Sequence, residues 1–254
     1  MTPIILYNNI FSNVLPLTAT DTTDGYDVLN VIDYKTYTYW QADSAGTKYI
    51  SIDCSGDVMA NCVGIAGHNL KTANATVSME SSADNSNWTT RVSDFIPDTD
   101  KAFTKLFDSA TARYWRLKIV TATIAAQIAV LMAGERLTFP CPPESPYIPY
   151  SESVELDSAR SKAGHLLGVV TRYKPIEINA RFSVLSRDWV FNQYLTFWEN
   201  HASRILPFFW AWDVVTYPEH VYFVTITEKM KYSIPLSIGA YADSMEINME
   251  GIII

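Results

Sequence analysis

The sequence predicts a mainly β protein, with an N-terminal β-sandwich followed by a strand-rich α+β domain that carries one helix. Three observations support this prediction. Aromatic residues make up 13% of the chain, and large rings fit the pleated faces of sheets. Short segments of alternating polarity recur between polar turns, which is typical of strands. A stretch near residue 190 repeats its apolar residues with the spacing of a helix.

A proline-rich segment divides the chain. Five prolines fall within the eleven residues Phe139–Pro149, and such a run can continue neither a helix nor a central strand. We therefore predict a first domain over residues 1–139, a proline-rich linker and arm over 140–168, and a second domain over 169–254. The arm is predicted because Tyr147–Gly168 shows little apolar pattern.

Short strands fill the first domain. The segments Tyr49–Asp53 and Thr76–Glu80 alternate in polarity, whereas Cys62–Ala66 and Gln127–Ala133 are almost wholly apolar. Apolar residues alternate with basic ones within Arg113–Val120. Several short strands separated by polar turns, without a capped helix between them, indicate a β-sandwich.

The second domain combines strands with one helix. Residues 176–185, 221–227 and 244–250 read as strands, and Ser186 is a candidate N-cap for a helix over 187–202. The predicted inward face of the first strand holds Ile176, Ile178, Ala180, Phe182 and Val184. The predicted inward face of the helix holds Phe191, Tyr194, Leu195 and Trp198. The C-terminal Ile252–Ile254 is predicted to be paired or covered.

Composition excludes several classes of protein. The net charge is −8 and no basic stripe is present, which argues against nucleic-acid binding by phosphate neutralisation. No segment approaches the roughly 18 apolar residues of a membrane span. The N-terminus has no signal-peptide pattern, so we expect a soluble protein made in a cytoplasm. Charged residues make up only 18% of the chain, which is consistent with a surface partly covered by partners.

No metal or cofactor site is predicted. The spacing of Cys54, Cys62 and Cys141 matches no zinc pattern, and buried thiols are the better interpretation. Asp33 and Asp53 are possible calcium ligands, but no dense acidic loop surrounds them, so turn and strand-end roles are favoured.

Catalysis is not predicted either. Nothing near His68 completes a nucleophile–base pair, and a hydrogen-bonded loop histidine is the better interpretation. The carboxylate pairs Glu152/Glu155 and Glu246/Glu250 are conceivable for a glycosidase, yet they read equally as solvated faces. We expect a protein that is not an enzyme.

An aromatic run, Pro207–Asp213, follows the predicted helix. Its four large rings exceed what one strand hides on one face, and aromatic residues are enriched at interface centres. We therefore predict that Phe208, Phe209, Trp210 and Trp212 contribute to a subunit interface. The alternative is core packing under the helix.

Four ordered motifs give the first domain a family resemblance. The opening Asn30–Asp33 with Thr38–Trp40, the strand Tyr49–Asp53, and the segments Ser81–Trp88 and Ala112–Leu117 together resemble a galactose-binding-like, discoidin-type jelly roll. Gly64–Leu70 is similar to a stretch of such domains in tailed-phage proteins. The resemblance implies a jelly roll in which Trp40 and Trp88 either stack on sugar rings or belong to the core.

The second domain resembles the ring-forming domain of phage distal-tail or tail-tip hub proteins. The resemblance rests on Asp188-Trp189, on Thr196–Glu199 and on Pro207–Trp210. It implies a closed ring of copies, with a hexamer favoured over a trimer, that contacts tail-tube and tail-hub proteins in the virion. The order of the two domains is reversed relative to many distal-tail proteins.

Three functions are therefore under consideration. The leading hypothesis is a structural component of a phage tail tip, which connects the tail tube to tip and host-recognition proteins. The alternative is a carbohydrate-binding adhesion module for host-surface glycans. A glycan hydrolase is the third, and it lacks a convincing acid–base pair.

Overall fold

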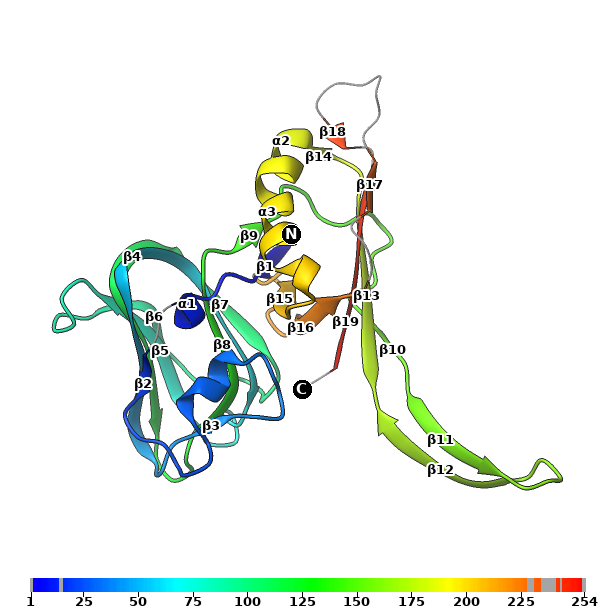
Figure 1. Ribbon diagram of the computed structural model, residues 1–254, viewed down its shortest axis with the longest axis horizontal. Coiled ribbons are helices and arrows are strands. Elements are labelled where there is room, and N and C mark those ends of the chain that lie inside the picture. The colour runs from blue at the N-terminus through cyan, green and yellow to red at the C-terminus, as the bar shows by residue number, and fades with distance from the viewer. Residues whose placement is uncertain (1, 14–15, 228–230, 234–240, 243, 253–254) are drawn as a thin grey trace.

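The computed structural model describes residues 2–13, 16–227, 231–233, 241–242 and 244–252. Strands dominate the chain, as a β-sandwich on one side and a second sheet beside it (Figure 1). One helical segment lies on that second sheet. These features confirm the predicted mainly β fold class with a jelly roll and one main helix.

The jelly roll is built from a sheet of order β3-β8-β4-β7-β5-β6, with β2 paired to β4. The bounds of its strands are β2 (Leu17–Ala19), β3 (Trp40–Gln41), β4 (Gly46–His68), β5 (Thr76–Ser82), β6 (Thr89–Phe95), β7 (Phe103–Thr121) and β8 (Gln127–Gly134). Two helical turns, α1 (Ile10–Asn13) and η1 (Val28–Ile32), pack beside the strands. The pairing of β4 with β7 shifts register between Asp53 and Val58, and such an irregularity bends a strand.

The core of the jelly roll follows from alternation along its strands. Trp115, Leu117 and Ile119 of β7 are buried, while Arg116 and Lys118 point outward, as the sequence predicts. Trp40 is also fully buried in this core. Large buried rings and branched side chains hold the sandwich together.

The second sheet has the order β10-β13-β19-β16-β15-β1-β9, with β17 paired to β19. The bounds are β1 (Ile4–Leu6), β9 (Leu137–Thr138), β10 (Ser151–Glu152), β13 (Pro175–Phe182), β15 (Phe208–Ala211), β16 (Val221–Ile226), β17 (Lys231–Ser233) and β19 (Ser244–Ile252). A separate short pair is formed by β14 (Leu185–Ser186) and β18 (Tyr241–Ala242).

The predicted domain boundary at residue 139 does not match the strand pairing of the second sheet. Strand β1 pairs with both β15 and β9, so the first residues of the chain complete the sheet of the second domain. Composition along the chain does not reveal this pairing, because β15 lies about 200 residues after β1 in the sequence.

The alternation predicted for β13 ends earlier than expected. Ile176, Ile178, Ala180 and Phe182 are buried on one face, but Val184 lies beyond the strand and is 59% exposed. At the start of β13, Pro175 pairs with Ile252, the last residue of β19. Residues 253–254 of the isoleucine run lie outside the described residues.

The predicted helix is present as a helical segment that His201 interrupts before the last turn. It comprises α2 (Arg187–Trp189), η2 (Val190–Tyr194), α3 (Leu195–Asn200) and η3 (Ala202–Arg204). The Ser186 hydroxyl accepts a hydrogen bond from the Trp189 amide, as predicted for an N-cap.

A π turn shifts the inward face of this helix. In η2 the Leu195 amide donates to the Val190 carbonyl, which inserts one extra residue into the turn. Val190, Tyr194 and Phe197 are consequently buried, whereas Phe191 is 45% exposed and Trp198 only half-buried. The predicted face was right at Tyr194 and wrong at Phe191, because the spacing rule assumes an uninterrupted α-helix.

The second sheet is covered on both faces at its centre. One face packs under the helix, in a core that contains Phe208, Trp210 and Phe197. The other face packs on the jelly roll, in a core that contains Phe209 and Met132. The chain thus forms three layers, with the central strands of the second sheet in the middle (Figure 1).

Candidate functional site: a projecting arm and the acidic cleft at its base

The aromatic run lies inside the molecule. Phe208 and Trp210 are fully buried on the helix side, and the Phe208 ring lies 5.1 Å from that of Phe197. Phe209 faces the jelly roll, and Trp212 is only 8% exposed. The prediction of a subunit interface at Phe208, Phe209, Trp210 and Trp212 was therefore wrong. The rings occupy both faces of a central strand, and each face is covered by another layer of the same chain.

The two tryptophans considered for sugar binding differ. Trp40 is fully buried and its indole nitrogen donates to the Asp21 carbonyl oxygen at 3.1 Å, so this ring offers no face to a ligand. Trp88 is half-buried at the surface of the jelly roll. Of the two rings, only that of Trp88 is placed to contact a ligand.

Trp88 belongs to a cluster on the outer face of β7, which we call the aromatic clamp (Tyr49, Glu80, Trp88 and Arg116). The guanidinium carbon of Arg116 lies 3.8 Å from the Trp88 ring centroid and 4.3 Å from that of Tyr49. The Arg116 Nε donates to Glu80 Oε2 at 2.6 Å. Cation–π contacts and a charge-assisted hydrogen bond thus fix the position of Trp88.

The two aspartates suggested for calcium have local structural roles. Asp33 accepts from the Lys35 amide and the Thr38 hydroxyl, both at 2.8 Å. Asp53 forms a bidentate pair with Arg113, and the hydrogen bond from this arginine lowers the pKa of Asp53 to about 2. In the described residues, no group of three or more His, Cys, Asp or Glu is placed to hold a metal ion.

The three thiols are not disulfide-bonded. Burial raises the pKa of Cys54 to about 11 and that of Cys62 to about 12, and it also raises the pKa of Cys141. Thiols with raised pKa values are poor nucleophiles at neutral pH.

In the part of the chain that the structure describes, no helix is long and apolar enough to cross a membrane.

His68 and His201 are buried and hydrogen-bonded. His68 Nε2 lies 3.0 Å from the Lys101 carbonyl oxygen, and His201 Nε2 lies 2.8 Å from that of Pro207. Burial lowers the pKa of both imidazoles. His68 is therefore a hydrogen-bonded residue at the end of β4 rather than in a loop, and its Nδ1 lies 3.8 Å from Asp100 Oδ1.

The stability of the protein is expected to fall as the pH drops below about 6.5, the ordinary histidine pKa. Because the folded-state pKa values of His68 and His201 are lowered, the unfolded chain binds more protons than the folded one. The free energy of unfolding therefore rises with pH, and the contribution of the neutral imidazoles is complete only above that value. Urea unfolding at about pH 7.5 and about pH 5.5 measures the difference. The variant His201→Gln should reduce it, whereas His165→Gln, at an exposed position, should leave it unchanged.

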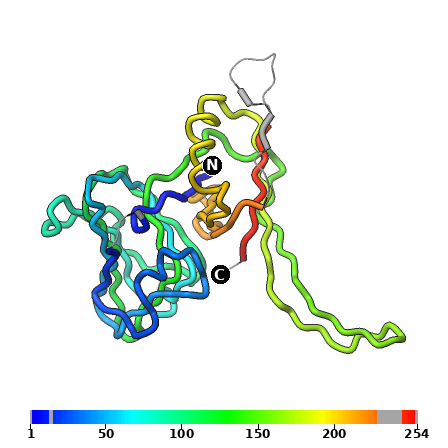
Figure 2. The backbone as a smooth tube through the Cα atoms, in the orientation of Figure 1, coloured from blue at the N-terminus to red at the C-terminus, as the bar shows by residue number. Residues whose placement is uncertain are grey.

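The arm is a β-hairpin that projects from the second sheet. It consists of β11 (Glu155–Arg160) and β12 (Leu166–Tyr173), which pair with each other and with no other described strand. Every residue of both strands is exposed. Figure 2 shows the hairpin extending away from the rest of the chain.

Large apolar side chains lie on this exposed hairpin, with exposed fractions between 45% and 68%. They are Leu156, Leu166, Leu167, Val169, Val170 and Tyr173. An isolated two-stranded hairpin is at best marginally stable in water, and contiguous exposed apolar surface marks sites of protein contact. The arm has the character of a segment that becomes buried on association.

The charges of the arm are divided along its length. Near the base, Arg172 donates to Asp157 at 2.6 Å and Lys174 pairs with Glu152 at 3.2 Å. At the tip, Arg160 and Lys162 have no carboxylate partner among the described residues. The tip is therefore basic.

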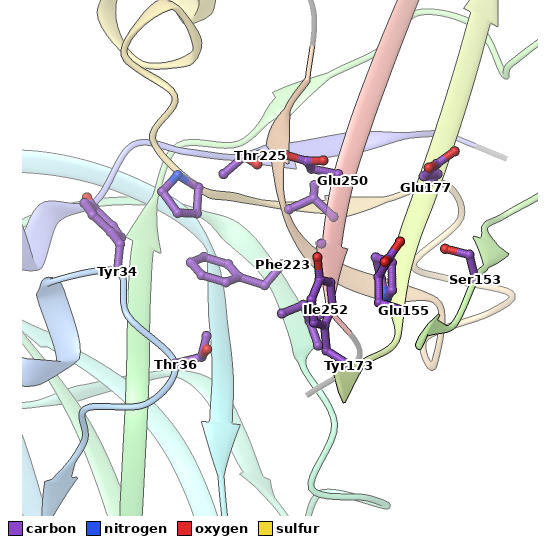
Figure 3. A pocket seen from close by; sticks show the side chains of 14 residues that line it. Tyr34, Thr36, Ser153, Glu155, Tyr173, Glu177, Phe223, Thr225, Glu250 and Ile252 are labelled. Atoms are coloured by element: carbon purple, nitrogen blue, oxygen red, sulfur yellow. The ribbon is translucent and has the colours of Figure 1, made fainter. Parts of the chain in front are cut away.

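A cleft of about 510 Å³ lies at the base of the arm. Glu155, Glu177 and Glu250 line it from the strands, and Tyr34 and Thr36 line it from a loop of the jelly roll (Figure 3). None of the three glutamates pairs with a described cation. We call this feature the acidic cleft.

The acidic cleft continues along the open face of the second sheet. A second cavity of about 520 Å³ shares Glu177 and Glu250 and is also lined by Asn179 and Asn248. The Asn179 amide donates to Glu246 Oε1 at 2.6 Å. The open face is thus polar and mostly acidic, whereas its reverse face is apolar and covered by the helix.

Two of the cleft carboxylates oppose one another in the sheet. Glu177 of β13 and Glu250 of β19 are direct cross-strand partners, and like charges in this position destabilise a sheet. Glu177→Gln is therefore expected to raise the free energy of unfolding by about 0.2–1 kcal/mol in urea unfolding. Glu152→Gln is the matched control, since this carboxylate pairs with Lys174 and its loss should bring no gain.

Sequence reasoning missed both the apolar arm and the acidic cleft. The arm was treated as a segment without apolar pattern, although Leu166–Tyr173 is rich in branched residues and follows Gly164, which are signals of a hairpin strand. The cleft had no such signal, because the pairing of Glu177 with Glu250 depends on sheet register.

Residues 16–131 match the family model described as the F5/8 type C domain. No curated protein sequence matches the chain. Among solved structures, chitosan-binding module 1 of a chitosanase/glucanase from Paenibacillus sp. IK-5 is similar, with 18% identity, a TM-score of 0.43, and coverage of 50% of this chain and 98% of that one. The module CpGH89CBM32-5 from Clostridium perfringens, in complex with GalNAc-β-1,3-galactose, has 19% identity, a TM-score of 0.41 and coverage of 47% and 94%.

The family match lies within the jelly roll and spans its strands from the start of β2 into β8. It agrees with the four motifs that carry the resemblance in the sequence, all of which fall inside it. The chain therefore contains a galactose-binding-like jelly-roll domain of the F5/8 type C kind.

Proposed function

We propose that the protein is a non-enzymatic structural subunit of an assembly and that the arm joins each copy to the next. The exposed apolar hairpin is the observation that carries this proposal. Burying one large apolar side chain stabilises a contact by about 1.5–3 kcal/mol, so several such residues supply enough for association. The buried aromatic run plays no part in the contact.

The finer form of the proposal is a ring in the tail tip of a phage virion. It is supported by the resemblance of Asp188-Trp189, Thr196–Glu199 and Pro207–Trp210 to ring-forming tail proteins. An arm that contacts a different surface of the neighbour produces a heterologous interface, and such interfaces close into rings when the rotation allows. Tail-tube and tail-hub proteins are the partners this form predicts.

Removal of the arm tests the assembly proposal. We expect the wild-type chain to sediment as an oligomer, and a variant in which residues 156–172 are replaced by Asn-Gly to sediment as a monomer lighter than the 28.6 kDa of the wild-type chain. The melting temperature should stay nearly unchanged, because no arm residue belongs to a core cluster. An armless chain that assembles like the wild type would disprove the proposal.

A second function, glycan binding by the jelly roll, is favoured by a specific observation. Residues 16–131 match the F5/8 type C model, and Trp88 keeps part of its ring at the surface of this domain. A half-buried indole held in place by a neighbouring arginine offers a rigid platform for a sugar ring. The two functions are compatible, since the arm projects away from the jelly roll (Figure 1).

A glycan array tests this second function. Trp88→Ala is expected to weaken binding of any recognised glycan at least tenfold, or about 1.4 kcal/mol. Tyr37→Ala is the control, since this ring is 77% exposed but lies outside the aromatic clamp. A wild-type chain without glycan hits, or a Trp88→Ala variant that binds like the wild type, would contradict the assignment.

A further inference from the structure

We propose that the tip of the arm from one copy docks in the acidic cleft of a second copy. The inference rests on the proposed function, since it names the surface that receives the arm. The chain carries one unmatched basic surface and one unmatched acidic surface, and its arm points away from its own cleft (Figure 2).

The receiving surface is negatively charged and partly apolar. Glu155, Glu177 and Glu250 line the cleft without a cation among the described residues. The aromatic side chains of Tyr173 and Phe223 lie beside them (Figure 3). A partner that brings both cations and apolar side chains would complete this lining.

The cleft also retains a destabilising arrangement. Glu177 and Glu250 are direct cross-strand partners, so their repulsion persists in the free chain. A cation placed between them would turn this repulsion into attraction. Sites that bind a partner often keep such locally unfavourable groups, because binding compensates for them.

The arm tip has the complementary chemistry. Arg160 and Lys162 supply two cations without a described carboxylate partner, and Leu166 and Leu167 supply apolar side chains that are 54% and 68% exposed. The Arg160 guanidinium donates to the Gly164 carbonyl oxygen at 3.2 Å, which holds it at the tip. The arm tip therefore offers cations to the acidic part of the cleft lining and apolar side chains to its apolar part.

The contact has to be intermolecular. Strand β12 runs into β13 with Lys174 alone between them, so the arm is an extension of the second sheet. Its eight residues extend roughly 25 Å at about 3.3 Å per residue, which carries the tip away from the cleft at its own base (Figure 2). A second copy is the occupant that this geometry selects.

Sedimentation velocity on full-length variants tests the docking. The cleft variant Glu177→Lys/Glu250→Lys and the tip variant Arg160→Glu/Lys162→Glu should each self-associate roughly 30-fold more weakly than the wild type, or less. A chain that carries all four substitutions should assemble again, because the charges are exchanged. Mixing the cleft variant with the armless chain should give a 1:1 complex and nothing larger, since one has only a working arm and the other only a working cleft.

The outcomes separate this inference from the proposed function. If the cleft variant assembles like the wild type while the armless chain is monomeric, the arm docks elsewhere and the inference is overturned. Failure of the fourfold variant to assemble, despite a wild-type melting temperature, also overturns it. If the armless chain assembles, or the wild type is monomeric up to about 1 mM, the proposed function fails as well.

Discussion

Phe209→Ala is expected to lower the free energy of unfolding by about 3–5 kcal/mol, the cost of deleting a fully buried phenyl ring. The ring lies between the second sheet and the jelly roll, where its centroid is 5.0 Å from that of Phe223. Its removal leaves a cavity that two rigid sheets cannot close. Urea unfolding, followed by tryptophan fluorescence, measures the change.

A partner substitution shows whether the loss comes from the contact between the layers. A Cβ atom on Gly64 of the jelly roll would lie 2.8 Å from the Phe209 ring, so Gly64→Ala should cost about 1–3 kcal/mol in the wild type. In the Phe209→Ala background this cost should largely vanish, which is a coupling measurable by a double-mutant cycle. Tyr37→Ala, at an exposed position, should change stability little. Additive effects of the Gly64 and Phe209 substitutions would contradict the described packing.

Arg116→Leu is expected to cost about 3–5 kcal/mol, because it leaves the carboxylate of Glu80 buried without its cation. Glu80 is 8% exposed and accepts from Arg116 at 2.6 Å. The substitution also removes the cation–π contacts with Tyr49 and Trp88. Thermal and urea unfolding at neutral pH give the measurement.

The same strand offers a matched control. Arg113 also forms an arginine–carboxylate pair, with Asp53, but both side chains are more than 40% exposed. Arg113→Leu should therefore change stability very little, because water screens and replaces exposed pairs. The double variant Arg116→Leu/Glu80→Met should recover most of the loss, since apolar residues can replace a buried ion pair. Equal costs for Arg113→Leu and Arg116→Leu would rule out burial as the cause.

Local periodicity predicted a large part of the fold. The alternation of Trp115, Leu117 and Ile119, and of Ile176 to Phe182, assigned the buried face of two strands correctly, because side chains alternate across any strand. The Ser186 cap and the helix after it were predicted for a similar reason. The inward face of the helix was predicted only in part, because a fixed spacing rule does not detect the π turn at Val190–Tyr194.

The candidate site was predicted less well than the fold. The aromatic run carried the prediction of an interface, and the structure assigns it to two cores of one chain. A sequence shows how much apolar surface a strand carries, but it does not show which layers cover that surface. The arm was expected as a segment with little apolar pattern and is a regular hairpin with exposed leucines and valines.

The sequence by itself determined the mainly β class, the jelly roll, the position of the helix and the absence of a basic stripe, because composition, local alternation and ordered motifs depend on neighbouring residues alone. The tertiary structure decided that β1 joins the second sheet, that Phe209 packs against Gly64, and that Glu177 opposes Glu250. It also decided that the arm stands free of the body. These features arise from contacts between residues far apart in the chain, and sheet register and layer packing bring such residues together only when the whole chain is folded.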